Sequence, residues 1–593
     1  MANAAAKAIQ DKIRDTRAGF TDAQAGEAGH LRDRAGRGCL RSARRTFEQG
    51  IQCVQVNSVN ALASIQDSAM IIHAPYGCAA CGSLGTLERI NVYRRHMGDE
   101  SGLSSRIFSS ALGEKEVILG GEQRLEDAAR EAVARHNPKI VFLLASCASA
   151  IIGDDIDMVA DRLREEYPGT VFAPVHCEGF KSRNHATGYD LALSALQNYV
   201  IGDARPDRQE GLINLFATHS LSFADQREMK RMLRAIGLDA NILPFNASYG
   251  DIMRIPAAEY NISVCQIFGD EYMAFLKERY GAPYVVTCMP IGSDSTDRWL
   301  RAIAGLAGRE AEAEAFIARE RAEVEGEIGR IRQKTDGLKV CITAGTGRGL
   351  AAATIMGEYR MKLLCMHAPY YEKAYVPDFE RLEEYHGSDF LINVADMQPY
   401  EQINLIKKFR PDVFIGMANW VSRLGLPTTH ILDGKRPTFG YRGVLYLGRK
   451  LEDALDNNNF NAKLKNFASP PFRESWYLED AFKYMEFPED EGGGDGGGGE
   501  SGSEIGERIL DISGKSGELN AARKLAGAGE LAEAGKLAGA SELAEAGKSA
   551  GASELAESGE SSKLDAAGEL AGASELAEAG RAGGRKPDGG AAA

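Results

Sequence analysis

Long hydrophobic runs are absent from this 593-residue chain. No stretch of roughly twenty apolar residues occurs, so the sequence predicts no membrane-spanning helix. The N-terminal segment, residues 1–36, is charged and helix-prone, and it lacks the apolar core of a secretory signal. We therefore expect a cytoplasmic protein.

A concentrated basic surface is also lacking. The chain carries a formal net charge of −15, and residues 489–593 hold 21 acidic and 10 basic residues, which leaves about −4 for the remainder. Nucleic-acid binding needs clustered positive charge, so we exclude it. A phosphate loop of the G-x-x-x-x-G-K-[ST] type is missing too, so any ATP hydrolysis must take place on a partner.

Large apolar side chains are scarce in the C-terminal segment. After Pro488 a glycine-rich acidic stretch leads into an imperfect E-L-A-E-[AS]-G repeat, which contains no aromatic or β-branched residue. Such a composition cannot offset the entropy lost on folding, so we predict that residues 489–593 are disordered. A weak interaction tail is the alternative.

The remaining chain alternates short apolar runs with amphipathic stretches. Continuous apolar runs are typical of strands buried on both faces of a parallel sheet, and the predicted strands are 139–145, 170–175, 212–217, 338–344, 361–366 and 412–417. The predicted helices between them include 122–136, 225–236, 271–280 and 310–332. This alternation predicts an α/β fold of doubly wound, Rossmann-like parallel-sheet domains, with ligands at the carboxyl ends of the strands.

Ten cysteines are present, and in a long cytosolic chain each is a buried thiol, a ligand or a nucleophile. Cys341 and Cys365 lie inside apolar runs, which favours buried packing. Cys78 in H-A-P-Y-G-C and Cys147 in A-S-C-A-S-A-I-I-G-D-D-I instead follow strand-like segments directly. Thiolates at strand ends suit iron–sulfur ligation, because soft sulfur ligands hold iron and rigid strand ends fix their geometry.

The order of four motifs resembles the α-subunit of nitrogenase component 1 and its nitrogenase-like relatives. These motifs are H-A-P-Y-G-C, S-C-A-S-A-I-I-G-D-D-I, P-V-H-C-E-G-F and V-C-Q-I-F-G-D-E-Y-M-A-F-L-K-E-R-Y-G-A-P-Y. The resemblance runs from about Cys39 to Lys450. It implies three doubly wound domains, at 38–205 (relay cluster), 206–335 (cofactor cysteine) and 336–488 (C-terminal), between an N-terminal helical extension at 1–37 and the tail at 489–593.

The resemblance implies a first metal site at Cys53, Cys78 and Cys147. These residues match the α-subunit ligands of a bridging [8Fe-7S] P-type cluster, with a homologous β-type partner supplying the other ligands in an α2β2 heterotetramer. Cys53 is one residue out of register, and Cys39 is its competitor. Cys177, in C-E-G-F, reads as a structural marker beside the pocket.

A second site is implied for a nitrogenase-type iron–sulfur cofactor. Cys265 matches the cysteine that holds one end of this cofactor, and His430 lies about two residues from the family's histidine at the opposite end. His367, in M-H-A-P-Y-Y, is the reserve candidate. Arg348, in T-A-G-T-G-R-G-L, matches an arginine that reaches the cofactor from a Gly-rich turn and adds positive charge.

Departures from the family pattern bear on the reaction. His185 and Tyr189 stand where dinitrogen-reducing relatives carry a glutamine and a histidine, so the proton supply differs. The segment 416–425 is shortened and contains no lysine, whereas molybdenum nitrogenase carries one there that binds its cofactor's organic acid.

Within the family, the retained ligands for both clusters and the lost dinitrogen-specific polar residues make the sequence resemble the large catalytic subunit of methylthio-alkane reductase. The resemblance then implies electrons from an ATP-dependent iron protein and reductive carbon–sulfur cleavage of a small sulfur compound to a thiol and a hydrocarbon. An alternative nitrogenase, a non-catalytic scaffold for cofactor assembly, and a chain that has lost its metal remain as competing hypotheses.

Overall fold

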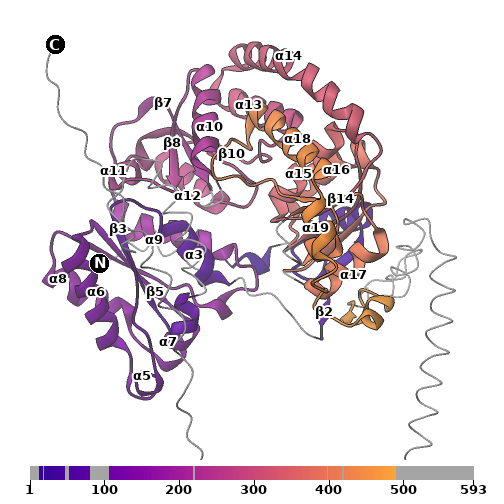
Figure 1. The fold of residues 1–593 in the computed structure, drawn as a ribbon. Coiled ribbons are helices and arrows are strands. Elements are labelled where there is room, and N and C mark those ends of the chain that lie inside the picture. Colours follow the sequence, from indigo (N-terminus) through magenta and orange to yellow (C-terminus); the bar gives the residue numbers. More distant parts are fainter. Residues whose placement is uncertain are drawn as a thin grey trace, which may run out of the picture. The chain divides into compact units, whose positions relative to one another are not determined.

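A computed structural model describes residues 13–17, 19–46, 53–80, 106–217, 221–396, 398–416 and 420–488. The tail predicted to be disordered, residues 489–593, lies outside the described residues, as does Cys81. Three sheets of mainly parallel strands organise the described chain (Figure 1). None of the helices within the described ranges is long and apolar enough to cross a membrane.

The first sheet is fully parallel, with the strand order β4-β3-β5-β6. Its central strands are continuous apolar runs that are buried on both faces. The strands are β3 (Ser68–His73), β4 (Ile107–Ser109), β5 (Ile140–Ala145) and β6 (Val171–Val175). The helices of this region are α3 (Val54–Leu62), α5 (Glu114–Leu119), α6 (Glu122–His136), α7 (Cys147–Ile152), α8 (Ile156–Glu166) and α9 (Thr187–Ala195), the last continuing into the π-helix η3 (Leu196–Ile201), and the short 3-10 helix η2 (Gly179–Lys181).

The second sheet is also parallel, in the order β10-β9-β7-β8. Its strands are β7 (Gln209–Ala217), β8 (Asp239–Pro244), β9 (Ala258–Ser263) and β10 (Tyr284–Val285). The helices of this region are α10 (Phe223–Ala235), α11 (Tyr249–Met253), α12 (Asp270–Tyr280) and α13 (Ser293–Ala307).

The third sheet has the order β1-β13-β12-β11-β14-β15, in which only β1 runs antiparallel to its neighbour. Its strands are β1 (Gln24–Glu27), β11 (Lys339–Thr343), β12 (Lys362–Ala368), β13 (Leu391–Val394), β14 (Val413–Gly416) and β15 (Thr428–Thr429). The helices are α14 (Glu310–Thr335), α15 (Thr346–Glu358), α16 (Val376–His386), α17 (Pro399–Phe409), α18 (Gly440–Asp456) and α19 (Asn459–Leu464).

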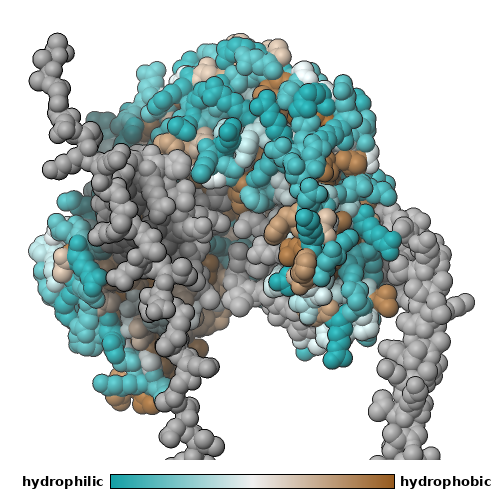
Figure 2. Space-filling model, viewed as in Figure 1, coloured by the Kyte–Doolittle hydropathy of each residue, from teal (hydrophilic) through white to brown (hydrophobic). Residues whose placement is uncertain are grey.

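The α/β class and the parallel sheets are confirmed. Each of the six predicted strands overlaps an observed strand, and α6 begins and ends at the residues predicted for it. Helix α14 ends three residues later than predicted and buries a stripe of apolar residues, while its outer side is hydrophilic (Figure 2). This division is what an amphipathic surface helix requires.

The N-terminal extension, predicted to be helical, is only partly so. Helix α2 (Ala28–Gly36) is present, but residues 24–27 form β1 and add an edge strand beside β13. No periodic apolar pattern marks this strand, because it is short and Ala23, Gln24 and Ala25 are all buried. It forms by pairing with the edge of a sheet more than 360 residues later in the sequence. Residues 14–16 form a 3-10 turn, η1. The remaining predicted domain boundaries stay predictions.

Candidate functional site

Two of the predicted ligands of the first site, Cys53 and Cys147, lie side by side. Cys53 is the N-cap residue of α3, and Cys147 is the first residue of α7, two residues after the end of β5. Gly179 lies between them: a Cβ at Gly179 would stand 3.1 Å from Cys147 Sγ and 3.7 Å from Cys53 Sγ. Both thiols therefore border the same small space, which a larger residue at position 179 would fill.

Cys78 follows the adjacent strand. His73, at the end of β3, pairs in register with Ala145, at the end of β5, so the chain leaves both strands at the same edge of the sheet. Cys78 itself is exposed, and its N–H donates to the carbonyl of Pro75 at 3.1 Å. The buried His73 bonds Asp154 Oδ2 at 2.8 Å, which ties the start of the segment leading to Cys78 to the turn that follows α7.

The other cysteines of this region occupy different environments. Cys177 is fully buried, its thiol lies 3.5 Å from the carbonyl oxygen of Ala145, and burial raises its pKa well above the usual range. Cys39 is exposed and contacts the carbonyl of Arg34 at 3.4 Å. The position of Cys53 beside Cys147 thus favours Cys53 over Cys39, and the burial of Cys177 fits a structural role.

Within the described ranges, no three His, Cys, Asp or Glu side chains converge closely enough to hold a single metal ion. The donor set of Cys53 and Cys147 nevertheless fits part of a larger iron–sulfur cluster. Both thiols are partly exposed, both stand at helix N-termini, where backbone N–H groups favour negative charge, and Gly179 leaves the space beside them open.

The second site centres on Cys265, in the loop between β9 and α12. Cys265 is 6% exposed, and burial raises the pKa of its thiol to about 11, although N–H groups of Ile267 and Phe268 and the charge of Arg14 oppose this rise. A Cβ at Gly347 would stand 3.3 Å from Cys265 Cβ, so the glycine allows the start of α15 to lie directly against this loop.

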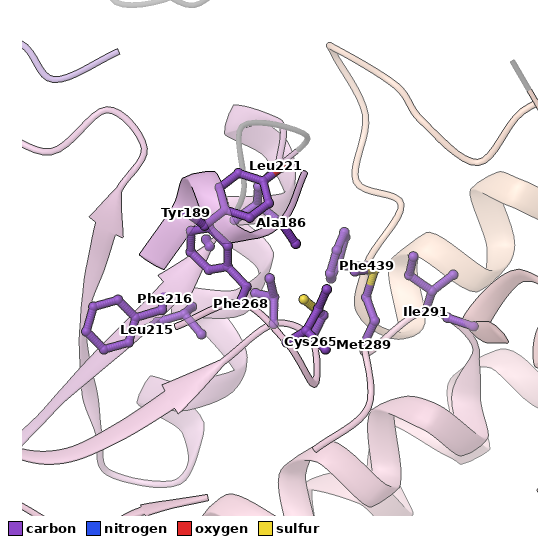
Figure 3. Close-up of a cluster of buried hydrophobic side chains, with 14 of the residues drawn as sticks. Ala186, Tyr189, Leu215, Phe216, Leu221, Cys265, Phe268, Met289, Ile291 and Phe439 are labelled. Carbon is purple, nitrogen blue, oxygen red and sulfur yellow. The ribbon is translucent and has the colours of Figure 1, made fainter. Parts of the chain in front are cut away.

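Aromatic and apolar side chains surround Cys265. Figure 3 shows Cys265 between Phe268 on one side and Met289 and Phe439 on the other, with Tyr189 close to Phe268. The rings of Tyr189 and Phe268 lie edge to face, with centroids 4.7 Å apart. All of these residues are buried. The surroundings of this cysteine are therefore mainly apolar.

His185 also belongs to this region. Its ring lies edge to face with Tyr370, with centroids 5.2 Å apart, and burial lowers its pKa to about 4. The carboxylate of Asp396 lies 3.9 Å from Nδ1. The imidazole is thus neutral near pH 7, so it would exchange hydrogen bonds with a bound molecule without acting as a standing positive charge.

Arg348 lies in the first turn of α15, next to Gly347. Its Nη1 donates to the carbonyl of Ile431 at 3.3 Å, and its guanidinium stands 5.2 Å from the ring centroid of Phe439. The neighbouring loop is held by Asp225, whose carboxylate accepts the N–H groups of Thr438 and Phe439. Arg348 therefore brings a buried positive charge to the turn that touches the Cys265 loop.

The structure does not bring the two candidate histidines to Cys265. His430 is exposed and its Nδ1 lies 3.2 Å from Lys450 Nζ; the partial burial of its ring and the lysine charge both lower its pKa. His430 precedes Ile431, the acceptor for Arg348, so its loop borders the site without directing the imidazole into it. His367 is buried on β12, 3.7 Å from Cys365 Sγ and 3.3 Å from Asn393, and burial lowers its pKa to about 3.

Sequence reasoning missed several residues that shape these sites. Gly179 is part of the C-E-G-F motif, but the motif does not show that this glycine lies beside Cys53 and Cys147. Tyr370 belongs to the M-H-A-P-Y-Y motif that also contains His367, and it lies two residues beyond Ala368, the last residue of β12. Its place just after a strand could therefore have marked it as a candidate site residue. Gly347 stands in the Gly-rich turn beside Arg348. The pairing of Asp225 with Ser222 at the start of α10 is local, but its contacts with Thr438 and Phe439 gave no signal, because those residues are more than 210 positions away.

Known proteins match the chain over most of its described length. The family described as "Nitrogenase component 1 type Oxidoreductase" matches residues 53–456. The chain is 27% identical to the nitrogenase iron-molybdenum cofactor biosynthesis protein NifE of Methanococcus maripaludis, over 68% of this chain and 83% of that protein. It is 24% identical to the nitrogenase molybdenum-iron protein alpha chain of the same species, over 66% and 84%. The solved structure "Nitrogenase Cp1 at pH 5" has a TM-score of 0.60 and 20% identity, and covers 79% of this chain and 100% of its own.

Proposed function

The chain belongs to the nitrogenase component 1 type oxidoreductases, and we propose from that membership that it is the cofactor-binding, catalytic subunit of a nitrogenase-like reductase. The single observation that carries this proposal is the separation of its candidate ligands into two settings. Cys53 and Cys147 meet at an accessible edge of the first sheet, whereas Cys265 is enclosed by aromatic side chains. One setting suits electron entry and the other suits chemistry away from water.

The first setting would hold half of an [8Fe-7S] P-type cluster through Cys53, Cys78 and Cys147. Cys78 and Cys147 each have a large exposed apolar neighbour. Tyr76, two residues before Cys78, is 75% exposed; Ile151, one helical turn after Cys147, is 76% exposed. Apolar side chains exposed around candidate ligands favour a protein–protein contact, which supports a homologous β-type subunit that completes the cluster in an α2β2 heterotetramer.

Further exposed apolar residues extend this surface. Phe180, next to Gly179, is 64% exposed, and helix α5 presents Ile118 and Leu119 to solvent. Helix α5 lies at the lower end of the molecule in Figure 2, where hydrophobic residues are visible. We assign this end to the contacts with the β-type subunit and with an ATP-dependent iron protein. The chain lacks a phosphate loop of its own, so the iron protein would couple ATP hydrolysis to electron delivery.

The second setting would hold a nitrogenase-type iron–sulfur cofactor. Such a cofactor, when bound, supplies low-potential electrons at an iron–sulfur surface where a substrate can be reduced. Cys265 would be its ligand from this chain, and Arg348 would provide positive charge against an anionic cluster. His430 would serve as a second ligand only if its loop turned the imidazole inward, away from Lys450.

His185 and Tyr189 would line the substrate side. The hydroxyl of Tyr189 donates to Asn57 Oδ1 at 3.4 Å, and Asn57 Nδ2 donates to the carbonyl of His185 at 3.1 Å, so the two positions share one hydrogen-bonded support. A neutral imidazole and a phenol can orient a substrate and pass single protons. The mainly apolar surroundings suit a small thioether, so we propose reductive C–S cleavage of methylthio-alkanes to a thiol and a hydrocarbon.

The test is an anaerobic gas assay of the chain co-purified with its partner subunit and iron protein. Methylthio and ethylthio compounds should release the corresponding hydrocarbon and thiol only when ATP is present. Dinitrogen and acetylene are supplied in parallel, because their reduction would identify an alternative nitrogenase instead. An active iron protein with no hydrocarbon release would overturn the proposed reaction.

A second candidate function is a scaffold for cofactor assembly. The similarity to proteins named NifE favours it, since those relatives are described as cofactor biosynthesis proteins. A scaffold must give up its cofactor, whereas the enclosure of Cys265 suits a resident one. The two are separated by incubating the iron-loaded complex with an apo-form of a nitrogenase component 1: a scaffold transfers iron and activates it, and a catalytic subunit keeps its iron.

Single cysteine variants test the two settings independently. Cys147→Ser should remove the relay cluster's iron and stop electron transfer while iron at Cys265 remains. Cys265→Ser should remove the iron at Cys265 while the relay cluster's iron remains. Cys341→Ser is the matched control, because Cys341 is fully buried in β11 of the third sheet, whereas Cys147 and Cys265 follow strands of the first and second sheets. Equal iron loss in all three variants would contradict the assignment of two separate sites.

A further inference from the structure

The described N-terminal segment, residues 13–17, contains a fully buried arginine. The side chain of Arg14 has 0% exposure and contacts three acidic residues. Its Nε lies 2.9 Å from Asp190, its Nη2 lies 2.9 Å from Asp270, and its Nη1 lies 3.7 Å from Glu372. A buried guanidinium with three carboxylates is uncommon, because each buried charge must be compensated.

The three carboxylates come from the three walls of the Cys265 site. Asp190 follows Tyr189 on α9, Asp270 opens the helix that follows the Cys265 loop, and Glu372 lies two residues after Tyr370. Arg14 Nη2 also donates to the carbonyl of Ile267, two residues after Cys265. One side chain therefore fastens all three walls together.

The residues beside Arg14 reinforce this arrangement. Arg17 Nη1 donates to Asp270 at 2.8 Å and to Glu372 at 3.2 Å. Asp15 accepts the N–H groups of Arg183 and Asn184 at 2.8 and 3.0 Å, which fixes the segment just before His185. The segment 13–17 thus contacts the chain on both sides of the pocket.

We propose that residues 13–17 form a strap that closes the Cys265 site, with Arg14 as the positioning residue of the Cys265 loop, and that this strap is released when a preformed iron–sulfur cofactor enters. The cofactor's passage rests on the proposed function, whereas the closing role rests on the contacts above. Release breaks the contacts that join α9, the Cys265 loop and the segment at Glu372, so these three walls become free to separate.

The test measures the accessibility of Cys265 in the full chain, produced in a host that makes no such cofactor. The rate of anaerobic alkylation by iodoacetamide is followed by mass spectrometry of the Cys265 peptide. Cys341 and Cys365, both fully buried, are internal references for general unfolding. Arg14→Met should raise the rate at Cys265 at least threefold and leave both reference rates unchanged.

Arg45→Met is the matched control. The side chain of Arg45 is 3% exposed and forms an ion pair with Glu401 at 2.8 Å and a hydrogen bond to the carbonyl of Val394. It lies against the third sheet and not against the Cys265 loop, so its variant should leave the Cys265 rate unchanged. Arg14→Lys keeps the charge but cannot reach all three carboxylates, so its rate should lie between those of the wild type and Arg14→Met.

The proposal is overturned if Arg14→Met changes the Cys265 rate less than threefold, if the reference cysteines react faster to the same extent, or if Arg45→Met has an equal effect. Should Arg14→Met not fold, Asp15→Ala decides, because it removes only the contacts to the 182–184 segment: the same threefold threshold applies. Cofactor binding is scored separately. If Cys265 reacts equally fast in the iron-loaded complex, the proposed function fails while the strap stands.

Discussion

Replacing Gly179 by alanine should change the stability of the fold little but should disturb a cluster bound at Cys53 and Cys147. The backbone of Gly179 does not have a positive φ, so alanine is conformationally allowed there. The new Cβ would stand 3.1 Å from Cys147 Sγ, whereas ordinary contact begins near 3.4 Å. The thiol of Cys147 must therefore move by about 0.3 Å.

The magnitude of the expected effect differs between the two states. Without a cluster, Cys147 can turn aside at about 0.5–1.5 kcal/mol, which the smaller conformational entropy of the unfolded alanine chain offsets by about 0.4–1 kcal/mol. The free energy of unfolding should thus change by less than about 1 kcal/mol. With a cluster, metal–ligand distances tolerate only about 0.2 Å, so the same displacement disturbs the Cys147–iron bond.

The assay compares thermal unfolding of the metal-free chain with iron content of the co-purified complex. Gly179→Ala should leave the melting temperature within about 3 °C and remove the relay cluster's share of the iron. Gly169→Ala is the control, since a Cβ at position 169 meets nothing within 4 Å. Normal iron content in Gly179→Ala would refute the placement of a cluster beside Gly179, and a large loss of stability would refute the assumption that Cys147 can turn aside.

Three further outcomes follow from the described contacts. Burial raises the pKa of Glu358 to about 7, so its contribution to stability is complete below about pH 4.5 and is lost as the pH rises through 7. In urea unfolding, Glu358→Gln should therefore gain about 3 kcal/mol relative to the wild type between pH 5 and pH 8, and an unchanged difference would contradict the shift. The Tyr371 hydroxyl is buried with no hydrogen-bond partner among the described residues, so Tyr371→Phe should be neutral or stabilising by about 1 kcal/mol; a loss of more than 1 kcal/mol would show a hidden partner. Arg348→Met should lower the iron retained at Cys265, as measured by iron content in the Cys147→Ser background, and full retention would exclude a role for its charge.

The sequence was sufficient for the elements that depend on local pattern. Continuous apolar runs such as 140–145 identify a strand buried on both faces, and α6 carries its own amphipathic period, so both were predicted. The motif order also predicted the fold, because Cys78 and Cys147 follow strands that prove to be neighbours. These signals lie within short windows of the chain.

Features that depend on distant contacts could not be predicted. Arg14 meets Asp190 and Asp270 across 176 and 256 residues, and no local pattern marks a charged side chain for complete burial. Likewise, the spacing that suggested His430 as a ligand gives no information on Lys450, whose Nζ stands 3.2 Å from the imidazole. Residue type and spacing predict which groups are available, whereas the direction of a side chain follows from packing.

The contacts of the strap form late in the synthesis of the chain. Arg17 bonds Glu372 across 355 residues, and at about 5–20 residues per second roughly 20–70 s of synthesis separate the two. Residues 13–17 are the first part of the described chain to leave the ribosome, and they are therefore among the last to dock. Until they dock, no Arg14 contacts join the walls around Cys265. The Cys265 site of newly made protein is therefore open until residues 13–17 dock. An affinity tag fused ahead of residue 13 would interfere with this docking step.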